Sequence, residues 1–410
     1  MALKVSPLAP EKAPDLPAID GVLLATAATG IKYTNRDDLL LVTLDEGSIC
    51  AGVLTKSGTA SAPVSWCRHA LTHDNTRGLL VNAGNANAFT GSPGEEHVRV
   101  SCETAASQIG CQSEQVMVAS TGVIGELLPI EKILQELPTL AANLAADGWK
   151  EAAQAILTTD TFAKVATKEV QIAGETVRIN GIAKGSGMIE PNMATMLAFI
   201  FTDANVTKTV LESLLVEANE QSFNSITVDS DTSTSDTCLL FSSRRAGHAR
   251  IESEDAPELN SFKESLNELM QDLAIQVVRD GEGASKLIQI DVTGADNDIL
   301  ARQVAKAIAN SPLVKTAIAG EDANWGRVIM AVGKSGVPID QNKIKLYMGG
   351  VQITENGSPL PNYDEGPVAQ HLKGQEISIK VELGEGAGRA RVWTCDLTHG
   401  YIEINADYRS

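Results

Sequence analysis

One threonine stands where a glycine-rich turn meets an apolar run, and its position suggests chemistry. Residues 183–204 read AKGSGMIEPNMATMLAFIFTDA, with Thr195 at the junction. If the bond between Ala194 and Thr195 were broken, residue 195 would carry both a hydroxyl nucleophile and an α-amine. That amine, with an unperturbed pKa of about 7.7–8.0, can act as a general base near neutral pH. The hydroxyl can also make the cut itself, by attacking the Ala194 carbonyl. The alternative, a threonine at the edge of a buried strand, stays open.

Other motifs of catalysis and ligand binding fail when their residues are counted. VGKSG has Val328 where a phosphate-binding loop needs a glycine, and GEGAGR has Arg389 where a dinucleotide fingerprint needs its last glycine. The loop after Asp229 has Thr234 and Leu240 in place of the glycine and glutamate of a calcium loop. No HExxH occurs among the histidines. A Ser-His-Asp triad stays open, because its members need not be neighbours in sequence.

Composition limits the class of protein and its partners. The chain has 410 residues, 43% hydrophobic content and a formal net charge of −19, which argues against nucleic acid or anionic membranes as partners. Its six cysteines form no CxxC pair, so we expect buried free thiols in a reducing compartment. No apolar run approaches the ~18 residues of a membrane span, and the first residues lack a signal-peptide core. These features predict a soluble, cytoplasmic protein.

Strand and helix patterns alternate along the chain, which predicts packed sheets covered by helices. Short apolar runs bounded by turn residues predict strands within 21–32, 38–48, 78–91, 195–201, 237–243, 286–294, 343–350, 376–384 and 400–410. Helical periodicity predicts helices within 92–110, 129–157, 207–223, 256–278 and 296–310. No repeat or low-complexity linker divides the chain.

The segment KGSGMIEPNMATML resembles the signature of the ornithine acetyltransferase family, also called glutamate N-acetyltransferase, in which cleavage falls between Ala and Thr. The resemblance extends along nearly the whole chain, through segments in the order that this family has. They are NAGNANAFTG, STGVIGELLP, TTDTFAK, DTSTSDT, RDGEGASK, SPLVKTAIAGEDANWGR and YIEINADYRS. Agreement at so many segments identifies the chain as a member of the family.

The resemblance implies a role for particular residues. Thr195 would cut the chain after Ala194 and then carry the acetyl group. Thr121 and Gly122 would form the oxyanion hole, one donating a hydroxyl and the other a backbone N–H. The resemblance assigns substrate binding to Thr158, Lys184, Thr195, Glu282, Asn405 and Ser410. It leaves open whether Thr158 or Thr159 contacts the substrate, while Lys184 would hold a carboxylate and Glu282 an amine.

The implied activity is transfer of an acetyl group from N-acetylornithine to glutamate, through an acetyl-threonine and with no metal or organic cofactor. The implied fold is a four-layer α/β/β/α sandwich. Residues 1–194 would form the α chain and 195–410 the β chain, which includes a C-terminal region from about 290, and two copies of each chain would assemble into a heterotetramer. Whether acetyl-CoA also serves as donor stays open.

Two alternatives to this activity stay open. An aminopeptidase of related architecture would give the acyl group to water, and a binding protein matured by self-cleavage would turn over nothing.

The chain departs from the family pattern at three residues. Ser410 replaces a terminal threonine but keeps the hydroxyl. Ser235 stands where the family usually has asparagine, and Ser230 where it usually has glycine, which leaves the conformation of that turn open.

Overall fold

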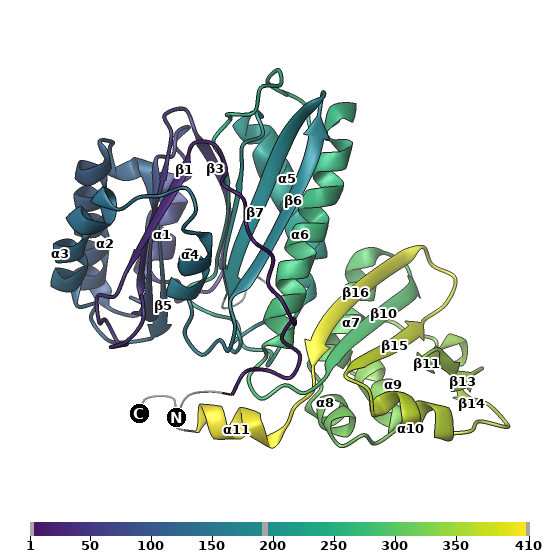
Figure 1. The fold of residues 1–410 in the computed structure, drawn as a ribbon. Helices are drawn as coiled ribbons and strands as arrows, with labels where there is room; N and C mark the ends of the chain where they lie inside the picture. The colour runs from purple at the N-terminus through teal and green to yellow at the C-terminus, as the bar shows by residue number, and fades with distance from the viewer. Residues whose placement is uncertain (1–3, 191–195, 407–410) are drawn as a thin grey trace. The chain divides into compact units, whose positions relative to one another are not determined.

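The computed structural model describes residues 4–190 and 196–406, and it divides the chain into two compact units. Unit 1 comprises residues 1–10, 225–230 and 278–410, and unit 2 comprises residues 11–224 and 231–277. Figure 1 shows the ribbon of both. The predicted cut between Ala194 and Thr195 lies outside the described residues, so the predicted α and β chains stay a prediction.

Unit 2 contains two sheets. The first has the strand order β1-β2-β4-β5, and only its β4–β5 pair is parallel. Its strands are β1 (Val22–Ala27), β2 (Leu39–Leu44), β4 (Gly78–Asn85) and β5 (Val116–Val123). The second has the order β3-β9-β8-β7-β6, and only β8–β9 is parallel. Its strands are β3 (Ile49–Leu54), β6 (Lys164–Ile172), β7 (Glu175–Lys184), β8 (Leu197–Thr202) and β9 (Thr237–Ser242).

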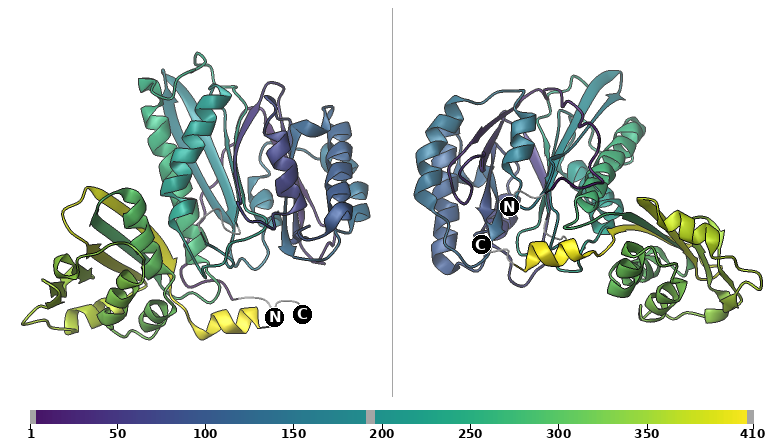
Figure 2. Two further views of the ribbon diagram at one scale, coloured as in Figure 1. Left: turned by 180° about the vertical axis from the view of Figure 1, so that it is seen from behind. Right: turned by 60° about the horizontal axis from the view of Figure 1, so that its bottom comes forward.

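Helices cover the outer faces of both sheets. On the first sheet pack α1 (Ala62–Ala70), α2 (Gly91–Ile109) and α3 (Ile130–Ala142). On the second pack α5 (Lys208–Gln221) and α6 (Asn260–Arg279), which Figure 2 shows side by side. Gly181 in β7 permits this approach, because a Cβ there would lie 2.6 Å from the Leu273 side chain of α6. The layers are therefore helix, sheet, sheet and helix, which confirms the predicted α/β/β/α sandwich.

The two sheets share one hydrophobic core. Between them lies α4 (Trp149–Ala155), which contacts β1 and β7. Its Trp149 ring meets Phe201 edge to face at 5.3 Å, and Phe201 stacks on Phe241 at 4.9 Å. Aromatic pairs in these geometries stabilise a core by about 0.5–1.5 kcal/mol each beyond the area that they bury. The strand that follows residue 195 is thus fixed by packing along its length.

Unit 1 is a mixed five-stranded sheet with helices and a two-stranded hairpin. The sheet order is β12-β11-β15-β10-β16. Its strands are β10 (Leu287–Ala295), β11 (Lys345–Met348), β12 (Val351–Gln352), β15 (Glu376–Glu382) and β16 (Gly388–Cys395), with the hairpin formed by β13 (Thr354–Glu355) and β14 (Ser358–Pro359). The helices are α7 (Asp298–Ala309), α8 (Pro312–Ala319), α9 (Trp325–Gly333), α10 (Gly366–Leu372) and α11 (His399–Asn405). Single 3₁₀ turns in the chain are η1 (Ser113–Gln115), η2 (Phe223–Ser225), η3 (Pro257–Leu259) and η4 (Gln341–Lys343).

Two predicted elements differ from the structure. The helix predicted over 129–157 is split into α3 and α4, because the backbone of Ala145 pairs with Leu24 beside β1. The strand predicted over 400–410 is wrong: the described part is the helix α11, whose N-cap Thr398 accepts the Gly400 N–H. The alternating residues of this segment do not bury a sheet face, since Ile402 is 64% exposed.

Membrane and thiol predictions can be compared with the described part of the chain. No helix in residues 4–190 and 196–406 is long and apolar enough to span a membrane. Five of the six free cysteines are buried, and Cys111 is half-buried. Burial raises the pKa of the Cys67 thiol to about 12, despite a backbone hydrogen bond from Val118 that favours the thiolate. This thiol therefore stays protonated at neutral pH.

Candidate active site

Thr121 and Gly122 lie at the carboxyl end of β5, beside the parallel strand β4. The register between these strands is irregular at Gly84 and Asn85, so the two backbones approach closely there. Gly122 has a φ of +133°, and a Cβ on it would lie 2.2 Å from the carbonyl carbon of Gly84. Only glycine fits this position. The packing of β5 against β4 therefore requires glycine at residue 122, whether or not its N–H binds an oxyanion.

Lys184 ends β7 and meets Thr121 from the other sheet. It is only 3% exposed, and its Nζ donates a hydrogen bond to Thr121 Oγ1 at 3.3 Å. In the register of the second sheet Lys184 pairs with Leu197, the first residue of β8. Two predicted site residues from different sheets are therefore in contact beside the start of β8.

Asp160 is the anion of this region, and sequence reasoning gave it no role. Its carboxylate accepts a hydrogen bond from Lys164 Nζ at 2.6 Å and lies 3.8 Å from Lys184 Nζ. Backbone N–H groups of Gly185 and Thr158 donate to the same carboxylate. Burial alone would raise the pKa of Asp160, but Lys164, Lys184 and the hydrogen bonds together lower it well below its usual value. Asp160 is therefore ionised at any physiological pH.

We call Thr121, Asp160, Lys164 and Lys184 the strand-end cluster. The side chains of Asp160 and Lys164 are fully buried, and that of Lys184 is 4% exposed. Lys184 Nζ lies near both the Thr121 hydroxyl and the Asp160 carboxylate, so the cluster brings a positive charge to Thr121 in a dry environment. Such a site stabilises an added negative charge, which can be a carboxylate or the oxyanion of a tetrahedral intermediate.

The structure distinguishes the two threonines that the sequence left as alternatives. Thr159 Oγ1 is already hydrogen-bonded to Ser186 Oγ at 2.7 Å. Thr158 presents its main-chain N–H to Asp160, and its hydroxyl has no hydrogen-bond partner in residues 4–190 and 196–406. The Thr158 hydroxyl is therefore available for a bond to a ligand, while the choice between Thr158 and Thr159 stays a prediction.

The predicted nucleophile and its neighbour, Thr195 and Ala194, lie outside the described residues, as does Ser410. The next residue along the chain, Met196, donates its N–H to the buried carboxyl of Asp236 at 3.2 Å. The sequence analysis assigned Asp236 no individual role, although it lies in the DTSTSDT segment that carries part of the resemblance. Its distance of 41 residues from Thr195 gives no hint of this contact, which follows from the parallel pairing of β8 with β9.

Unit 1 brings together the other predicted substrate-binding residues that the structure describes. Asn405, the last residue of α11, donates from Nδ2 to Glu282 Oε2 at 2.7 Å. Tyr401 in the same helix donates its hydroxyl to Asp229 at 3.2 Å. Gly283 allows α11 this approach, because a Cβ there would lie 2.4 Å from Tyr401 N. We call Asp229, Glu282, Tyr401 and Asn405 the α11 cluster.

Ser230 keeps the backbone conformation that glycine favours. Its φ is +66°, in the left-handed region, and its side chain is exposed. A residue with a Cβ is strained there by about 1–2 kcal/mol. The departure from the family pattern at Ser230 therefore leaves the turn in place at a small cost in free energy.

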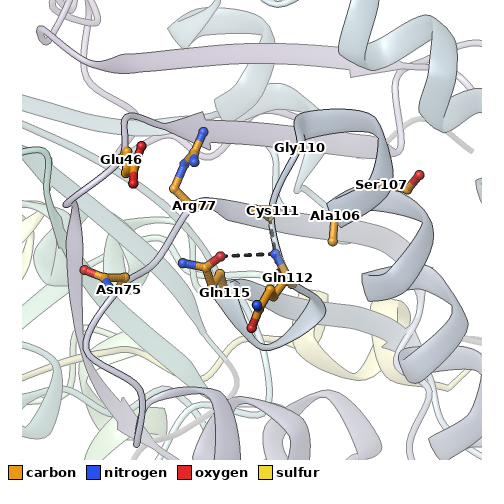
Figure 3. A pocket seen from close by; sticks show the side chains of 9 residues that line it. All are labelled: Glu46, Asn75, Arg77, Ala106, Ser107, Gly110, Cys111, Gln112 and Gln115. Atoms are coloured by element: carbon orange, nitrogen blue, oxygen red, sulfur yellow. Dashed lines mark hydrogen bonds between the residues drawn. The ribbon is translucent and has the colours of Figure 1, made fainter.

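A separate polar cavity of about 430 Å³ lies elsewhere in unit 2, at the amino ends of β4 and β5. Figure 3 shows its lining and the bond from Gln112 N to Gln115 Oε1, at 3.1 Å. Its lining residues are Glu46, Asn75, Arg77, Ala106, Ser107, Gly110, Cys111, Gln112 and Gln115. None is a predicted site residue, and Thr121 lies at the opposite end of β5. The cavity is thus distinct from the strand-end cluster.

Comparisons with known proteins agree along the whole chain. The model of the ArgJ family matches residues 23–410. A curated protein named arginine biosynthesis bifunctional protein ArgJ, from Gluconobacter oxydans, is 55% identical over 408 residues, covering 100% of this chain and 96% of its own length. The protein of the same name from Agrobacterium fabrum is 51% identical over 413 residues and is covered completely.

Solved structures give further matches. The crystal structure of arginine biosynthesis bifunctional protein ArgJ from Bacillus halodurans is 41% identical, with a TM-score of 0.48, and covers 50% of this chain and 95% of its own. The ornithine acetyltransferase from Mycobacterium tuberculosis, solved in complex with ornithine, is 31% identical with a TM-score of 0.38. It covers 42% of this chain and 93% of its own.

Proposed function

The chain belongs to the ArgJ family of arginine-biosynthesis enzymes, and on that premise we propose that it transfers an acetyl group from N-acetylornithine to glutamate. The observation that carries the proposal is the buried contact between Thr121 and Lys184 at the start of β8. It gives a hydroxyl donor and a positive charge, shielded from water, beside the strand that Thr195 precedes.

The reaction takes two steps through an ester on Thr195. The Thr195 hydroxyl attacks the acetyl carbonyl of N-acetylornithine while its proton passes to the free α-amine of residue 195. The C–N bond then breaks, that proton leaves with the ornithine nitrogen, and the acetyl group stays on Thr195. The α-amine of glutamate attacks this ester in the second step, which releases acetylglutamate and restores the hydroxyl.

Stabilisation of the oxyanion is proposed for Thr121 and Gly122. The buried ammonium group of Lys184 beside the Thr121 hydroxyl supports this role. Each donor of an oxyanion hole is worth about 2.7–4 kcal/mol of barrier. Lys184 would hold the substrate carboxylate, and the unpartnered hydroxyl of Thr158 would make a polar contact with it.

Glu282, Asn405 and Ser410 keep their predicted substrate-binding roles within this proposal. The proposal also includes cleavage between Ala194 and Thr195, a heterotetramer with two copies of each chain, and a cytoplasmic location. Acetyl-CoA as a second donor fits the word bifunctional in the names of the relatives. Formation of acetylglutamate from acetyl-CoA and glutamate without ornithine tests that part.

The central test uses Thr195→Ala, with the fragments weighed by mass spectrometry. We expect the wild-type protein to consist of two fragments, the second of which begins Thr-Met-Leu-Ala. We also expect acetylglutamate to form when N-acetylornithine and glutamate are both present. The variant stays uncut and its transfer falls to background, because no nucleophile is left. Thr195→Ser keeps a hydroxyl and retains both reactions at a lower rate.

Thr202→Ala is the matched control, since Thr202 is a fully buried threonine at the other end of β8. It is cut and active. Release of acetate without acetylglutamate would favour the aminopeptidase alternative, and an intact wild-type chain with full transfer activity would contradict the proposed nucleophile.

A further inference from the structure

Asp236 is a fully buried acid beside the start of β8, one residue beyond the predicted nucleophile in register. The parallel register pairs Leu197 with Thr237, so Asp236 lies opposite Met196. Thr237 N donates to the Met196 carbonyl at 3.1 Å, and Thr55 N donates to the Asp236 carbonyl at 3.0 Å. The main chain of Asp236 is thus held between β3 and β8.

The two carboxyl oxygens of Asp236 have different surroundings. Oδ1 accepts the Met196 N–H at 3.2 Å, whereas Oδ2 is buried without a hydrogen-bond partner. Burial raises the pKa of this carboxyl well above its usual value, although the Met196 N–H, the side chains of Thr55 and Ser233, and Lys184 act in the opposite direction. Burial thus favours the neutral form of the acid, which keeps one oxygen on the Met196 amide.

A buried carboxyl with an unpartnered oxygen costs free energy, about 1–3 kcal/mol for the missing hydrogen bond. An apolar side chain of the same size would avoid that cost. Such an apolar side chain could not accept a hydrogen bond from the Met196 N–H, the peptide group that follows residue 195. The carboxyl of Asp236 is the one group in the described part of the chain that accepts this N–H.

We propose that Asp236 is a positioning residue for acyl transfer: its carboxyl holds the Met196 N–H and so anchors the chain immediately after residue 195. The inference rests on the proposed role of Thr195 as nucleophile. A nucleophile displaced by about 1 Å loses about 10²-fold in rate. The same anchor serves self-cleavage, because the same hydroxyl must reach the Ala194 carbonyl.

The experiment compares Asp236→Ala, Asp236→Asn and a matched control at the other end of the same strand. Asp203 follows β8 and is a buried acid whose Oδ1 accepts a backbone N–H, that of Arg178, at 2.9 Å. Asp203→Ala therefore removes a comparable bond without touching residue 196. Each variant is assayed for cleavage by mass spectrometry and for kcat and KM at pH 6–9, with circular dichroism to confirm folding.

Asp236→Ala is expected to slow cleavage and to lower kcat about 10²-fold with KM within threefold. Asp236→Asn restores both, because its amide oxygen accepts the Met196 N–H and carries no charge, and its pH profile matches the wild type. Asp203→Ala leaves kcat unchanged. A wild-type kcat in Asp236→Ala, or an Asp236→Asn protein as impaired as Asp236→Ala, would overturn the inference.

A readout independent of activity separates this inference from the proposed function. The rate of hydrogen exchange at the Met196 amide should increase in Asp236→Ala. In Asp236→Asn it should match the wild-type rate. If the wild-type protein transferred no acetyl group, the proposed function would fail while this exchange pattern still supported the anchor. Equal exchange in all variants would refute the anchor whatever the activity.

Discussion

The strand-end cluster of unit 2 and the α11 cluster of unit 1 hold their polar groups by different means. In the strand-end cluster every member lies on or beside a paired strand, and the ion pair is sealed from water. In the α11 cluster Glu282 is 8% exposed, but Asn405 is exposed and sits at the end of a seven-residue helix.

This difference indicates a division of roles. A buried charge network is rigid, and its loss is costly because an unpaired charge remains in the interior. A helix of two turns whose last residue is exposed opens at a lower cost than paired strands in a core. We therefore expect changes in the strand-end cluster to affect folding and catalysis together, and changes in the α11 cluster to affect substrate binding alone.

The largest expected effect is that of Asp160→Ala, which removes the buried carboxylate that Lys164 and Lys184 both approach. Removal of one partner of a buried pair costs about 3–5 kcal/mol. We expect the midpoint of urea unfolding to fall accordingly, and transfer activity to fall with it. Glu268→Ala is the control, since its pair with Lys168 is exposed and such pairs contribute about 0–1 kcal/mol. An equal loss in both variants would contradict the comparison.

Stability against pH sharpens this test. The folded-state pKa of Asp160 is lowered, so its contribution is fully present above the unfolded pKa of about 3.9 and is lost as pH falls below that value. The gap in unfolding free energy between wild type and Asp160→Ala should therefore be constant from pH 5 to 8 and shrink below pH 4. A gap that shrinks near pH 6 would show that another group titrates in the cluster.

Glu282→Gln is expected to have an intermediate effect, confined to binding. The glutamine keeps an oxygen for the Asn405 amide but removes the negative charge proposed to meet a substrate amine. We expect KM to rise about tenfold, equivalent to about 1.4 kcal/mol, with kcat and the unfolding midpoint nearly unchanged. Steady-state kinetics decide the matter. A fall in kcat at constant KM would place Glu282 in the chemical step instead.

The smallest expected effect is a gain in stability from Ser230→Gly. Glycine relieves the left-handed strain at φ +66°, while its greater freedom in the unfolded chain offsets part of the gain. We expect a net gain of about 0.5–1 kcal/mol in urea unfolding. Ser230→Ala keeps the Cβ and should gain nothing. Equal stability of the two variants would mean that the Ser230 backbone is not strained.

Sequence patterns predicted the amphipathic helices and one fully apolar strand. The helices α2, α5, α6 and α7 were predicted within a few residues from their periodicity. The strand β8 was predicted from a continuous apolar run, which is buried on both faces. The prediction failed at α11, where a short alternating segment is typical of a strand. The Thr398 cap and the hydrogen bonds of Tyr401 and Asn405 make it a helix.

The site was predicted where chemistry marks a residue type and missed where tertiary structure sets its role. Thr121 and Lys184 were named from the resemblance, and the structure places them in contact. Asp160 and Asp236 were inside recognised segments yet had no assigned role. The sequence does not show that these aspartates are buried, because Lys184 and Gly185 reach Asp160 from the end of β7 and Met196 reaches Asp236 from the neighbouring strand β8.

The strand order of the second sheet affects the order of folding and cleavage, and also the refolding of the cut protein. A cut between Ala194 and Thr195 leaves β3, β6 and β7 in one fragment and β8 and β9 in the other, so the neighbouring strands β9 and β8 of one fragment lie between strands of the other. Neither fragment alone contains all the strands of this second sheet. The intact chain must therefore fold before it is cut, and the cut protein loses the tether that makes refolding unimolecular. We expect refolding of the cut protein to depend on its concentration, because the two separated fragments must meet by diffusion. At low concentration its unfolding is therefore effectively irreversible.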